Sequence, residues 1–240
     1  METFLNGKHA VVTGGTRGIG RAIADYLLRA GAAVAICGRA RESVDQAATE
    51  LKQSTGGDVF GHAADMSHSG EVEGFFAAVD SRFGGLDILI NNAGAGIFRG
   101  IQDLTLEDWR NTIDLNLSGV FYCCHYGLPL LRKRGEGYII QISSLAGINA
   151  FAGGAAYNAS KFGLNGFSEA IMQDLRYENI RVSYIMPGSV ETRFNPHSTP
   201  SDWKIAPEDV AEVVLNLLRM PIRTLVSRVE IRPSKPKKNG

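Results

Sequence analysis

Tyr157 and Lys161 open a long helical pattern over residues 155–178. Residues four positions apart lie on one face of an α-helix, so the phenol and the ammonium should be neighbours. A nearby ammonium stabilises phenolate, and we expect it to lower the Tyr157 pKa from about 10. The phenol would then be a proton donor usable near neutral pH. The pair alone is a weak signal, because such spacings also arise by chance.

Two further polar residues could serve the same chemistry. Ser144 follows a predicted strand over 138–143, and its hydroxyl can donate to a carbonyl oxygen of a substrate. The chain has no Gly-x-Ser-x-Gly elbow and no histidine placed as a base for Ser144, which argues against a serine nucleophile. Asn116 lies inside an apolar helical pattern over about 107–131, where asparagine usually faces solvent or competes with backbone hydrogen bonds.

A glycine-rich turn over residues 13–20 joins the first predicted strand to the first predicted helix. Gly14 permits a tight turn. Gly18 and Gly20 let a pyrophosphate approach the helix N-terminus, where free N–H groups and the helix dipole favour an anion. The spacing is Gly-x-x-x-Gly-x-Gly, and a turn without a ligand is the alternative in a chain with 28 glycines. The other expected cofactor contacts in this turn are Thr16, Arg17 and Ile19.

The residues after the second predicted strand indicate which cofactor binds. An acidic residue there would accept a hydrogen bond from the ribose 2′-hydroxyl of NAD, but the chain has Gly38 and Arg39. Arg17 and Arg39 fit a 2′-phosphate, because guanidinium groups bind phosphate well. We therefore expect NADP(H) in preference to NAD(H), with two solvated arginines as the alternative.

Polar residues also follow the third and fourth predicted strands. Asp65, which precedes Met66, could accept a hydrogen bond from the adenine amino group; the alternative is an N-cap of the next helix. Residues 91–94 read Asn-Asn-Ala-Gly, a composition typical of turns that tie the backbone together beside a ligand. We expect cofactor contacts from Asn92, Ala93 and Gly94.

Apolar strands alternate with helical patterns along the whole chain. The predicted strands are 9–13, 32–37, 59–64, 86–90, 138–143, 180–186 and 226–231. The predicted helices are 19–30, 41–54, 69–82, 107–131, 155–178 and 207–219. Strands that are apolar throughout indicate a parallel sheet covered on both faces. The expected fold class is α/β, a single doubly wound Rossmann-type sheet of about seven strands in one domain over 1–240.

The composition excludes several classes of protein. Formal net charge is zero, from 25 basic and 25 acidic residues, which argues against a nucleic-acid or anionic-membrane binder. The three cysteines and five histidines have no disulfide or metal-ligand spacing, so we expect no metal. The first residues lack the pattern of a signal peptide, and no apolar run is long enough to span a membrane. We expect a soluble, cytoplasmic protein.

Taken together, these segments resemble the short-chain dehydrogenase/reductase family. The motifs that carry the resemblance run in the family's order over nearly the whole chain: Thr-Gly-x-x-x-Gly-x-Gly at 13–20, Asn-Asn-Ala-Gly at 91–94, Asn116, Ser144, Tyr157-x-x-x-Lys161, and Pro-Gly-Ser-Val-Glu-Thr at 187–192. The resemblance implies hydride transfer between a nicotinamide cofactor and a carbonyl or alcohol substrate. It also implies that basic residues at 17 and 39 mark NADP preference.

The resemblance further implies a role for each member of a catalytic tetrad. Tyr157 would protonate the carbonyl oxygen, and Ser144 would orient that oxygen. Lys161 would hold the nicotinamide ribose and depress the tyrosine pKa, and Asn116 would position a water that relays protons to Lys161. Val190 and Thr192 would contact the carboxamide, and the remaining expected cofactor contacts in this segment are Pro187 and Gly188.

The chain departs from the family pattern at its C-terminus. Many members end in a Val-Asp-Gly-Gly turn, whereas this chain ends in a basic tail over 232–240 that we expect to be solvated. Tetramer geometry is therefore in doubt. A dimer through the helices near 107–131 and 155–178 is favoured over a monomer, because the sheet alone should not cover all their apolar residues: Phe121, Tyr122, Leu128, Phe162, Leu164, Phe167 and Ile171.

The substrate is less well defined than the chemistry. We expect a small-molecule ketone or aldehyde, reduced with NADPH. The nearest branch of the family is the 3-oxoacyl-[acyl-carrier-protein] reductases, and residues 132–134 could meet an acidic carrier. Glu178 stands where carrier-using relatives often have a basic residue, so a carrier protein is not favoured. The same motifs would also suit an NADP-dependent dehydrogenase of a small 3-hydroxy acid or sugar alcohol, and a cofactor-sensing protein without turnover is the least favoured interpretation.

A loop over about 190–207 is the expected seat of substrate specificity. It carries Phe194, His197 and Trp203 among Pro, Ser and Thr residues. We interpret it as a lid whose aromatic residues could close over an apolar ligand, with residues packed on the body of the protein as the alternative.

Overall fold

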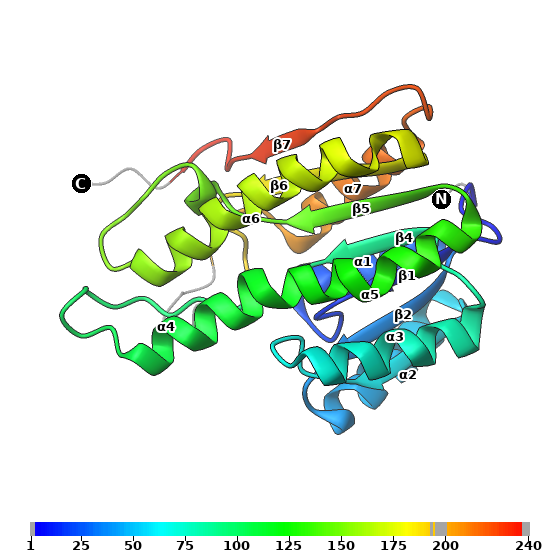
Figure 1. Ribbon diagram of the computed structural model, residues 1–240, viewed down its shortest axis with the longest axis horizontal. Helices are drawn as coiled ribbons and strands as arrows, with labels where there is room; N and C mark the ends of the chain where they lie inside the picture. Colours follow the sequence, from blue (N-terminus) through cyan, green and yellow to red (C-terminus); the bar gives the residue numbers. More distant parts are fainter. Residues whose placement is uncertain (1–2, 193, 195–200, 237–240) are drawn as a thin grey trace.

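The computed structural model describes residues 3–192, 194 and 201–236 and builds them around one seven-stranded parallel sheet (Figure 1). The strand order is β3-β2-β1-β4-β5-β6-β7. The strands are β1 (His9–Val12), β2 (Ala33–Gly38), β3 (Val59–Ala63), β4 (Ile88–Asn91), β5 (Gly137–Ile142), β6 (Ile180–Pro187) and β7 (Arg228–Ile231). The predicted doubly wound sheet is confirmed.

Helices cover both faces of the sheet. They are α1 (Gly18–Arg29), α2 (Arg41–Thr55), α3 (Ser69–Phe83), α4 (Leu106–Ile113), α5 (Gly119–Arg134), α6 (Ala155–Leu175) and α7 (Pro207–Arg219). Side chains of α1, α2 and α7 share one apolar core with the sheet, and those of α3, α5 and α6 share the other. Neighbouring strand residues serve opposite faces: Ala10 and Val12 belong to the first core and Val11 to the second.

The long helix predicted over 107–131 is interrupted. Helix α4 begins after Thr105, whose hydroxyl accepts a hydrogen bond from the Asp108 N–H in a capping box. A π-helical segment, Asp114–Ser118, then separates α4 from α5. A π-turn inserts a residue into the helical repeat and is frequent at functional sites. Asn116 lies within this wide turn and is fully buried, which the apolar periodicity did not predict.

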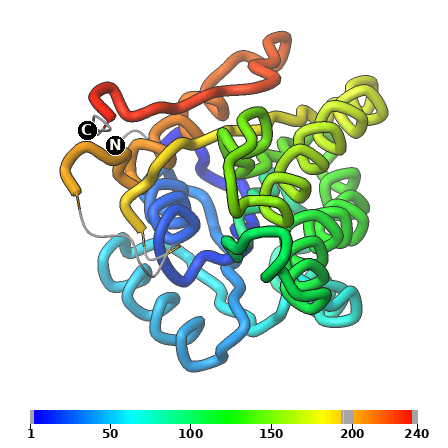
Figure 2. Tube along the Cα trace, turned by 90° about the vertical axis from the view of Figure 1, so that its left-hand side faces the viewer, coloured from blue at the N-terminus to red at the C-terminus, as the bar shows by residue number. Residues whose placement is uncertain are grey.

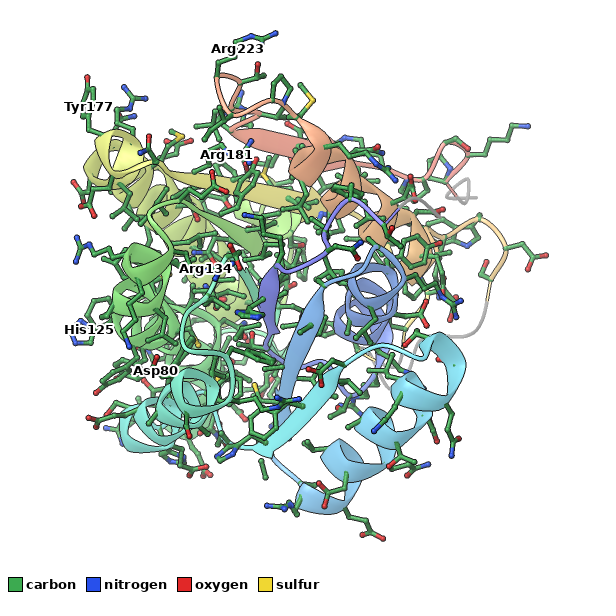
Figure 3. The ribbon with its side chains drawn as sticks, turned by 90° about the vertical axis from the view of Figure 1, so that its right-hand side faces the viewer. Asp80, His125, Arg134, Tyr177, Arg181 and Arg223 are labelled. Carbon is green, nitrogen blue, oxygen red and sulfur yellow. The ribbon has the colours of Figure 1, made fainter. Side chains whose placement is uncertain are left out.

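All the strands point the same way, so the loops that follow them gather at one edge. In Figure 1 the arrowheads of β4, β5 and β7 share one direction, and Figure 2 faces the loops beyond them. Figure 3 views the molecule from the opposite end, where the strands begin. Within the described ranges, the helices lack the combination of length and apolar character needed to cross a membrane.

The apolar face of α5 and α6 is only partly covered. Phe121 and Phe162 are about half exposed, and Phe167 packs against the edge of the Phe121 ring with centroids 6.4 Å apart. Leu164, expected on this open face, is instead buried in the core. Exposed aromatic rings on two neighbouring helices form an apolar patch of the kind that often marks a contact surface.

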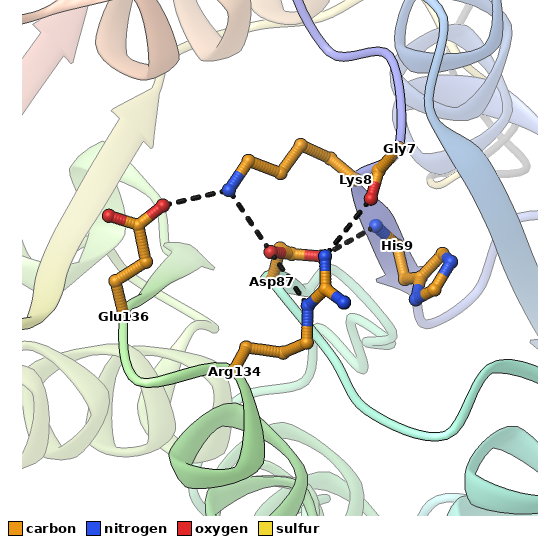
Figure 4. A network of polar contacts seen from close by, with 6 residues as sticks. All are labelled: Gly7, Lys8, His9, Asp87, Arg134 and Glu136. Atoms are coloured by element: carbon orange, nitrogen blue, oxygen red, sulfur yellow. Dashed lines mark hydrogen bonds and ion pairs between the residues drawn. The ribbon is translucent and has the colours of Figure 1, made fainter.

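A buried carboxylate ties the chain together at the beginning of the strands (Figure 4). Asp87 accepts hydrogen bonds from the Lys8 ammonium at 3.2 Å, the Arg134 guanidinium at 3.2 Å and the His9 backbone N–H at 2.8 Å. Lys8 also donates to Glu136 at 2.7 Å. These contacts join the start of β1, the residue before β4 and the end of α5, so Asp87 fixes three elements that lie far apart in the sequence.

We expect Asp87→Ala to lower the free energy of unfolding by about 2 kcal/mol or more, because it removes a buried carboxylate that accepts hydrogen bonds from two partly exposed cations and a backbone N–H. Urea denaturation measures this loss. The matched control is Asp58→Ala, which breaks the half-exposed ion pair with Arg82 at 2.7 Å. That change should cost no more than about 1 kcal/mol. Equal losses in the two variants would contradict a special role for Asp87.

Candidate active site

Hydrogen bonds join the glycine-rich turn to the loop after β4. The Thr13 hydroxyl accepts hydrogen bonds from the backbone N–H groups of Asn92 and Ala93, both at 3.0 Å. The Asn92 amide in turn donates to the carbonyls of Thr13 at 2.9 Å and Gly14 at 3.2 Å. The predicted backbone-tying role of this Asn-Asn-Ala-Gly segment is therefore seen for Asn92, which holds two sheet-edge loops in a fixed relation.

The three glycines of the turn have different roles. Gly14 and Gly18 have φ of +65° and +57°, the left-handed region in which glycine carries no steric penalty. A Cβ on Gly20 would collide with the Asn92 amide and the Gly14 carbonyl. Gly20 therefore permits close packing of the turn onto Asn92, a role that the sequence did not predict, and its contact with a pyrophosphate stays a prediction.

The start of α1 can accept an anionic group. Its N-cap residue, Arg17, has an extended backbone and makes no side-chain capping hydrogen bond. The N–H groups of the first turn are then left for a ligand or solvent, and the helix dipole favours a phosphate there. Thr192 lies beside Gly18, where an added Cβ would be 3.4 Å from its methyl group, so the segment after β6 closes on the same turn.

The two arginines predicted to select the cofactor lie on the surface, and one of them, Arg39, is near Asp65. Arg17 and Arg39 are exposed, and the positive charge of Arg39 acts on the Asp65 carboxylate. Burial opposes ionisation of Asp65, but hydrogen bonds from the Ser67 N–H and hydroxyl, together with Arg39, outweigh it and lower the Asp65 pKa. Asp65 thus stabilises the turn before α3, whose N-cap position is held by His68.

Other predicted cofactor contacts differ in how much of the side chain can face a ligand. The Met66 side chain is buried in the core, with its sulfur 3.5 Å from the Cys123 sulfur, so only its backbone is available. Ile19 and Val190 pack partly against the other core. Gly188 follows Pro187 at the end of β6 and donates its N–H to the Ile231 carbonyl at 2.8 Å, so it extends the hydrogen bonding between β6 and β7 by one residue.

Tyr157 and Lys161 lie together at the start of α6, as their spacing predicted. The Lys161 ammonium is 5.8 Å from the centre of the Tyr157 ring and donates a hydrogen bond to the Ile142 carbonyl at 3.0 Å. Both side chains are buried. Ser144 begins a short 3₁₀ turn, Leu145–Gly147, and its hydroxyl accepts a hydrogen bond from the Ala146 N–H at 3.1 Å.

Burial dominates the ionisation of both residues. It raises the pKa of the Tyr157 phenol, and a hydrogen bond with Ser144 acts in the opposite direction without reversing the shift. The prediction that Lys161 lowers the Tyr157 pKa is therefore wrong for this structure, because desolvation is the larger effect. Burial also lowers the pKa of Lys161 to about 8. Tyr157 accordingly holds its proton at neutral pH.

Asn116 joins the site to the loop after β4. Its amide donates to the Ala95 carbonyl at 2.8 Å and accepts from the Ala95 N–H at 2.9 Å. It also donates to the Ser160 hydroxyl at 3.1 Å, and Ser160 donates to the Tyr157 carbonyl at 2.8 Å. Asn116 is therefore neither solvent-facing nor paired with its own helix, because the π-turn directs it between two loops and α6.

The structure adds side chains that the sequence did not single out. Phe98 and Phe151 follow β4 and β5, and their rings pack on each other. Phe98 also packs on Phe194, and both of these rings pack on Tyr157. Asn165 accepts a hydrogen bond from Ser143, the residue before Ser144, and donates to the Gly147 carbonyl at 3.1 Å. The only available signal for the two phenylalanines was their position after strands, which is shared by many residues without a role.

Of the three aromatic residues expected in the loop over 190–207, Phe194 contacts Tyr157 and Trp203 is half-buried. His197 lies outside the described residues. The described part of the loop is held at its base by an ion pair between Glu191 and Lys204 at 3.0 Å. Within the described ranges, no three His, Cys, Asp or Glu side chains meet as a metal site.

Comparison with known proteins places these features in a family. The family model described as short chain dehydrogenase matches residues 8–203. An uncharacterized oxidoreductase of Staphylococcus aureus is 34% identical over 232 residues, which cover 96% of this chain and 99% of the relative.

Two solved structures are similar over almost the whole chain. The alcohol dehydrogenase of the archaeon Thermococcus sibiricus, complexed with 5-hydroxy-NADP, has a TM-score of 0.90 at 30% identity and covers 97% of this chain and 99% of its own. A metagenomic short-chain oxidoreductase in complex with NADP has a TM-score of 0.85 at 36% identity, with the same coverage.

The lowered Lys161 pKa predicts how stability depends on pH. Between the folded value of about 8 and the ordinary value of 10.5, the unfolded chain binds a proton that the folded chain does not. Stability therefore rises with pH in this window, by about 3 kcal/mol for this group. We therefore expect the unfolding free energy of wild type, minus that of Lys161→Met, to increase by that amount from about pH 7 to pH 10.5. Urea denaturation of both proteins at each pH measures it. A difference that does not change with pH would contradict the assignment.

Proposed function

The chain belongs to the short-chain dehydrogenase family, and from this we propose that it is an NADPH-dependent oxidoreductase that reduces a ketone or aldehyde to an alcohol. The observation that carries the proposal is the meeting of Tyr157, Ser144 and Lys161 at the carboxyl edge of the sheet, beside the glycine-rich turn. A protonated phenol and a hydroxyl in one buried site are the groups that a carbonyl oxygen needs as it gains negative charge.

The residues at this edge fit a nicotinamide dinucleotide. The free N–H groups at the start of α1 suit the pyrophosphate, and Gly14 and Gly18 keep that approach open. Arg39, with Arg17, would contact a 2′-phosphate. The neighbours complexed with NADP and 5-hydroxy-NADP support this choice of cofactor. When bound, the nicotinamide supplies the hydride.

The proposed mechanism assigns the remaining work to the chain's own residues. Ser144 donates to the substrate carbonyl oxygen and orients it toward Tyr157. Tyr157 transfers its phenolic proton to that oxygen as the alcohol forms. The raised Tyr157 pKa keeps this proton in place before reaction. The Lys161 ammonium, 5.8 Å from the centre of the Tyr157 ring, would place a positive charge beside the phenolate that is left. Asn116 fixes the loop at Ala95 and, through Ser160, the first turn of α6.

An acyl carrier protein is a less favoured partner. Each basic residue at the end of α5 is already paired with an acid: Arg132 with Glu178 at 2.6 Å, Lys133 with Asp80 at 2.7 Å, and Arg134 with Asp87 at 3.2 Å. An acidic carrier would have to compete with these pairs. A small free carbonyl compound is the substrate class that we propose.

Self-association is part of the proposal. The partly exposed rings of Phe121 and Phe162 on α5 and α6 support a dimer through this face. The molecular mass in solution decides between one copy and two or more, and a monomer at working concentrations would contradict the dimer. A cytoplasmic location stays a prediction.

We expect Tyr157→Phe to reduce carbonyl-dependent NADPH oxidation by about a hundredfold or more, because it removes the proton donor and keeps the ring. The assay follows absorbance at 340 nm over a panel of free ketones, diketones, keto acids and an acetoacetyl thioester. NADPH binding, followed by fluorescence, should survive. The control is Tyr177→Phe, which alters an exposed phenol at the far end of α6 (Figure 3). Full activity in Tyr157→Phe would contradict the proposed mechanism.

Cofactor choice has its own test. Arg39→Asp should shift the ratio of kcat/KM values from NADPH toward NADH by at least about tenfold, because a guanidinium partner of phosphate becomes an acceptor for a ribose hydroxyl. The charge-matched control is Arg223→Asp, which lies at the opposite end of the sheet (Figure 3) and should leave the ratio unchanged. Equal ratios in wild type and Arg39→Asp would refute the 2′-phosphate contact.

A further inference from the structure

The rings of Phe98 and Phe194 pack against Tyr157, and that of Phe151 packs against Phe98; we name these three phenylalanines the aromatic cluster. The ring centroids of Phe98 and Phe194 lie 5.5 and 5.7 Å from that of Tyr157. Phe98 also packs on Phe151 at 5.7 Å and on Phe194 at 6.5 Å. These separations are those of attractive aromatic pairs. The rings come from the loops after β4, β5 and β6, so the sheet edge brings them together.

The aromatic cluster is not part of the hydrophobic core. Phe98, Phe151 and Phe194 are 39%, 46% and 40% exposed, whereas Tyr157 beneath them is 8% exposed. Gly96 makes room for the arrangement, since a Cβ there would lie 2.6 Å from the rings of both Phe98 and Phe194. The rings therefore shield the phenol on one side and present apolar surface to solvent on the other.

This surrounding disfavours charged substrates. The faces of aromatic rings carry a negative quadrupole, which opposes a carboxylate placed against them. A cation could be attracted to the rings, but the Lys161 ammonium already lies 5.8 Å from the Tyr157 ring and would repel it. The same ammonium would attract a carboxylate, but Lys161 is buried and donates to the Ile142 carbonyl, so it does not face a carboxylate held at the exposed rings. A neutral molecule is the class that these surroundings accept.

Access to Tyr157 also selects for shape. A carbonyl compound that reaches the phenol must take the place of some of the ring contacts that now cover it. A substrate with an apolar ring next to its carbonyl restores those contacts, whereas a small aliphatic or polar compound leaves them unmade. The difference in contact favours the ring-bearing substrate in the transition state as well as in the bound state.

We propose that the substrate is a neutral ketone or aldehyde with an aromatic or alicyclic ring next to the carbonyl carbon, and that Phe98 and Phe151 determine this preference. The inference rests on the proposed function. It makes small keto acids, and in reverse small 3-hydroxy acids and sugar alcohols, poor substrates, because their charged or hydroxyl groups would face the phenylalanine rings.

The test compares kcat/KM for acetophenone and cyclohexyl methyl ketone with the values for 2-butanone and acetoacetate, with NADPH as cofactor. The ring ketones should exceed the other two by about tenfold or more. Phe98→Leu and Phe151→Leu keep apolar bulk but remove a ring, and each should lower the ratio of acetophenone to 2-butanone by about threefold to tenfold. Tyr177→Leu, which removes a ring that is 91% exposed on the far side, should not change the ratio.

The outcomes separate this inference from the proposed function. Turnover in which 2-butanone or acetoacetate equals the ring ketones, or in which both leucine variants keep the wild-type ratio, would overturn the substrate class and leave the oxidoreductase intact. If no carbonyl compound oxidises NADPH, the proposed function fails. Binding of acetophenone, measured by saturation-transfer NMR, then tests the aromatic cluster independently of turnover. Binding weakened in Phe98→Leu and Phe151→Leu but not in Tyr177→Leu would support the aromatic cluster as a ring site, and equal binding in all four proteins would refute it.

Discussion

The parallel direction of the seven strands is the constraint on which the rest of the molecule depends. Because every strand ends at the same edge, the loops after β1, β4, β5 and β6 are neighbours there although they span most of the chain. Hydrogen bonds between Thr13, after β1, and Asn92, after β4, hold two of these loops together. A change that slipped either strand would separate the glycine-rich turn from the loop that holds Asn116.

The site itself is a network of buried polar side chains. Asn116, Ser160, Lys161 and Asn165 are all buried, and each has hydrogen-bond partners in the backbone or in another side chain. Burial without partners would be costly, so these contacts are what allow polar groups to sit beside the core. The same burial raises the pKa of Tyr157 and lowers the pKa of Lys161, because in both residues it disfavours the charged form.

The two ends of the sheet use buried polar groups differently. At the end where the strands begin, Asp87 is surrounded by Lys8, Arg134 and the His9 N–H, so its charge is satisfied within the chain. At the other end, the first turn of α1 has no side-chain cap, and exposed aromatic rings stand over the buried Tyr157. Groups that the chain leaves unpaired are available to a ligand. The proposed chemistry therefore lies at the end where the strands finish, whereas the contacts of Asp87 at the other end stabilise the fold.

The sequence by itself determined the sheet, the order of its elements and the positions of the motifs. Apolar runs and helical periodicity are local properties, and the spacing of Tyr157 and Lys161 on one helix face follows from helix geometry alone. Only the tertiary structure decided the properties that depend on what surrounds a residue: the direction of the Tyr157 pKa shift, the packing role of Gly20, and the burial of Asn116 in a π-turn. The packing of Phe98 on Phe151 and Phe194 belongs to the same group, because it depends on which strand ends lie side by side. Desolvation and contact between distant segments are set by the whole fold, and no local pattern of residue types records them.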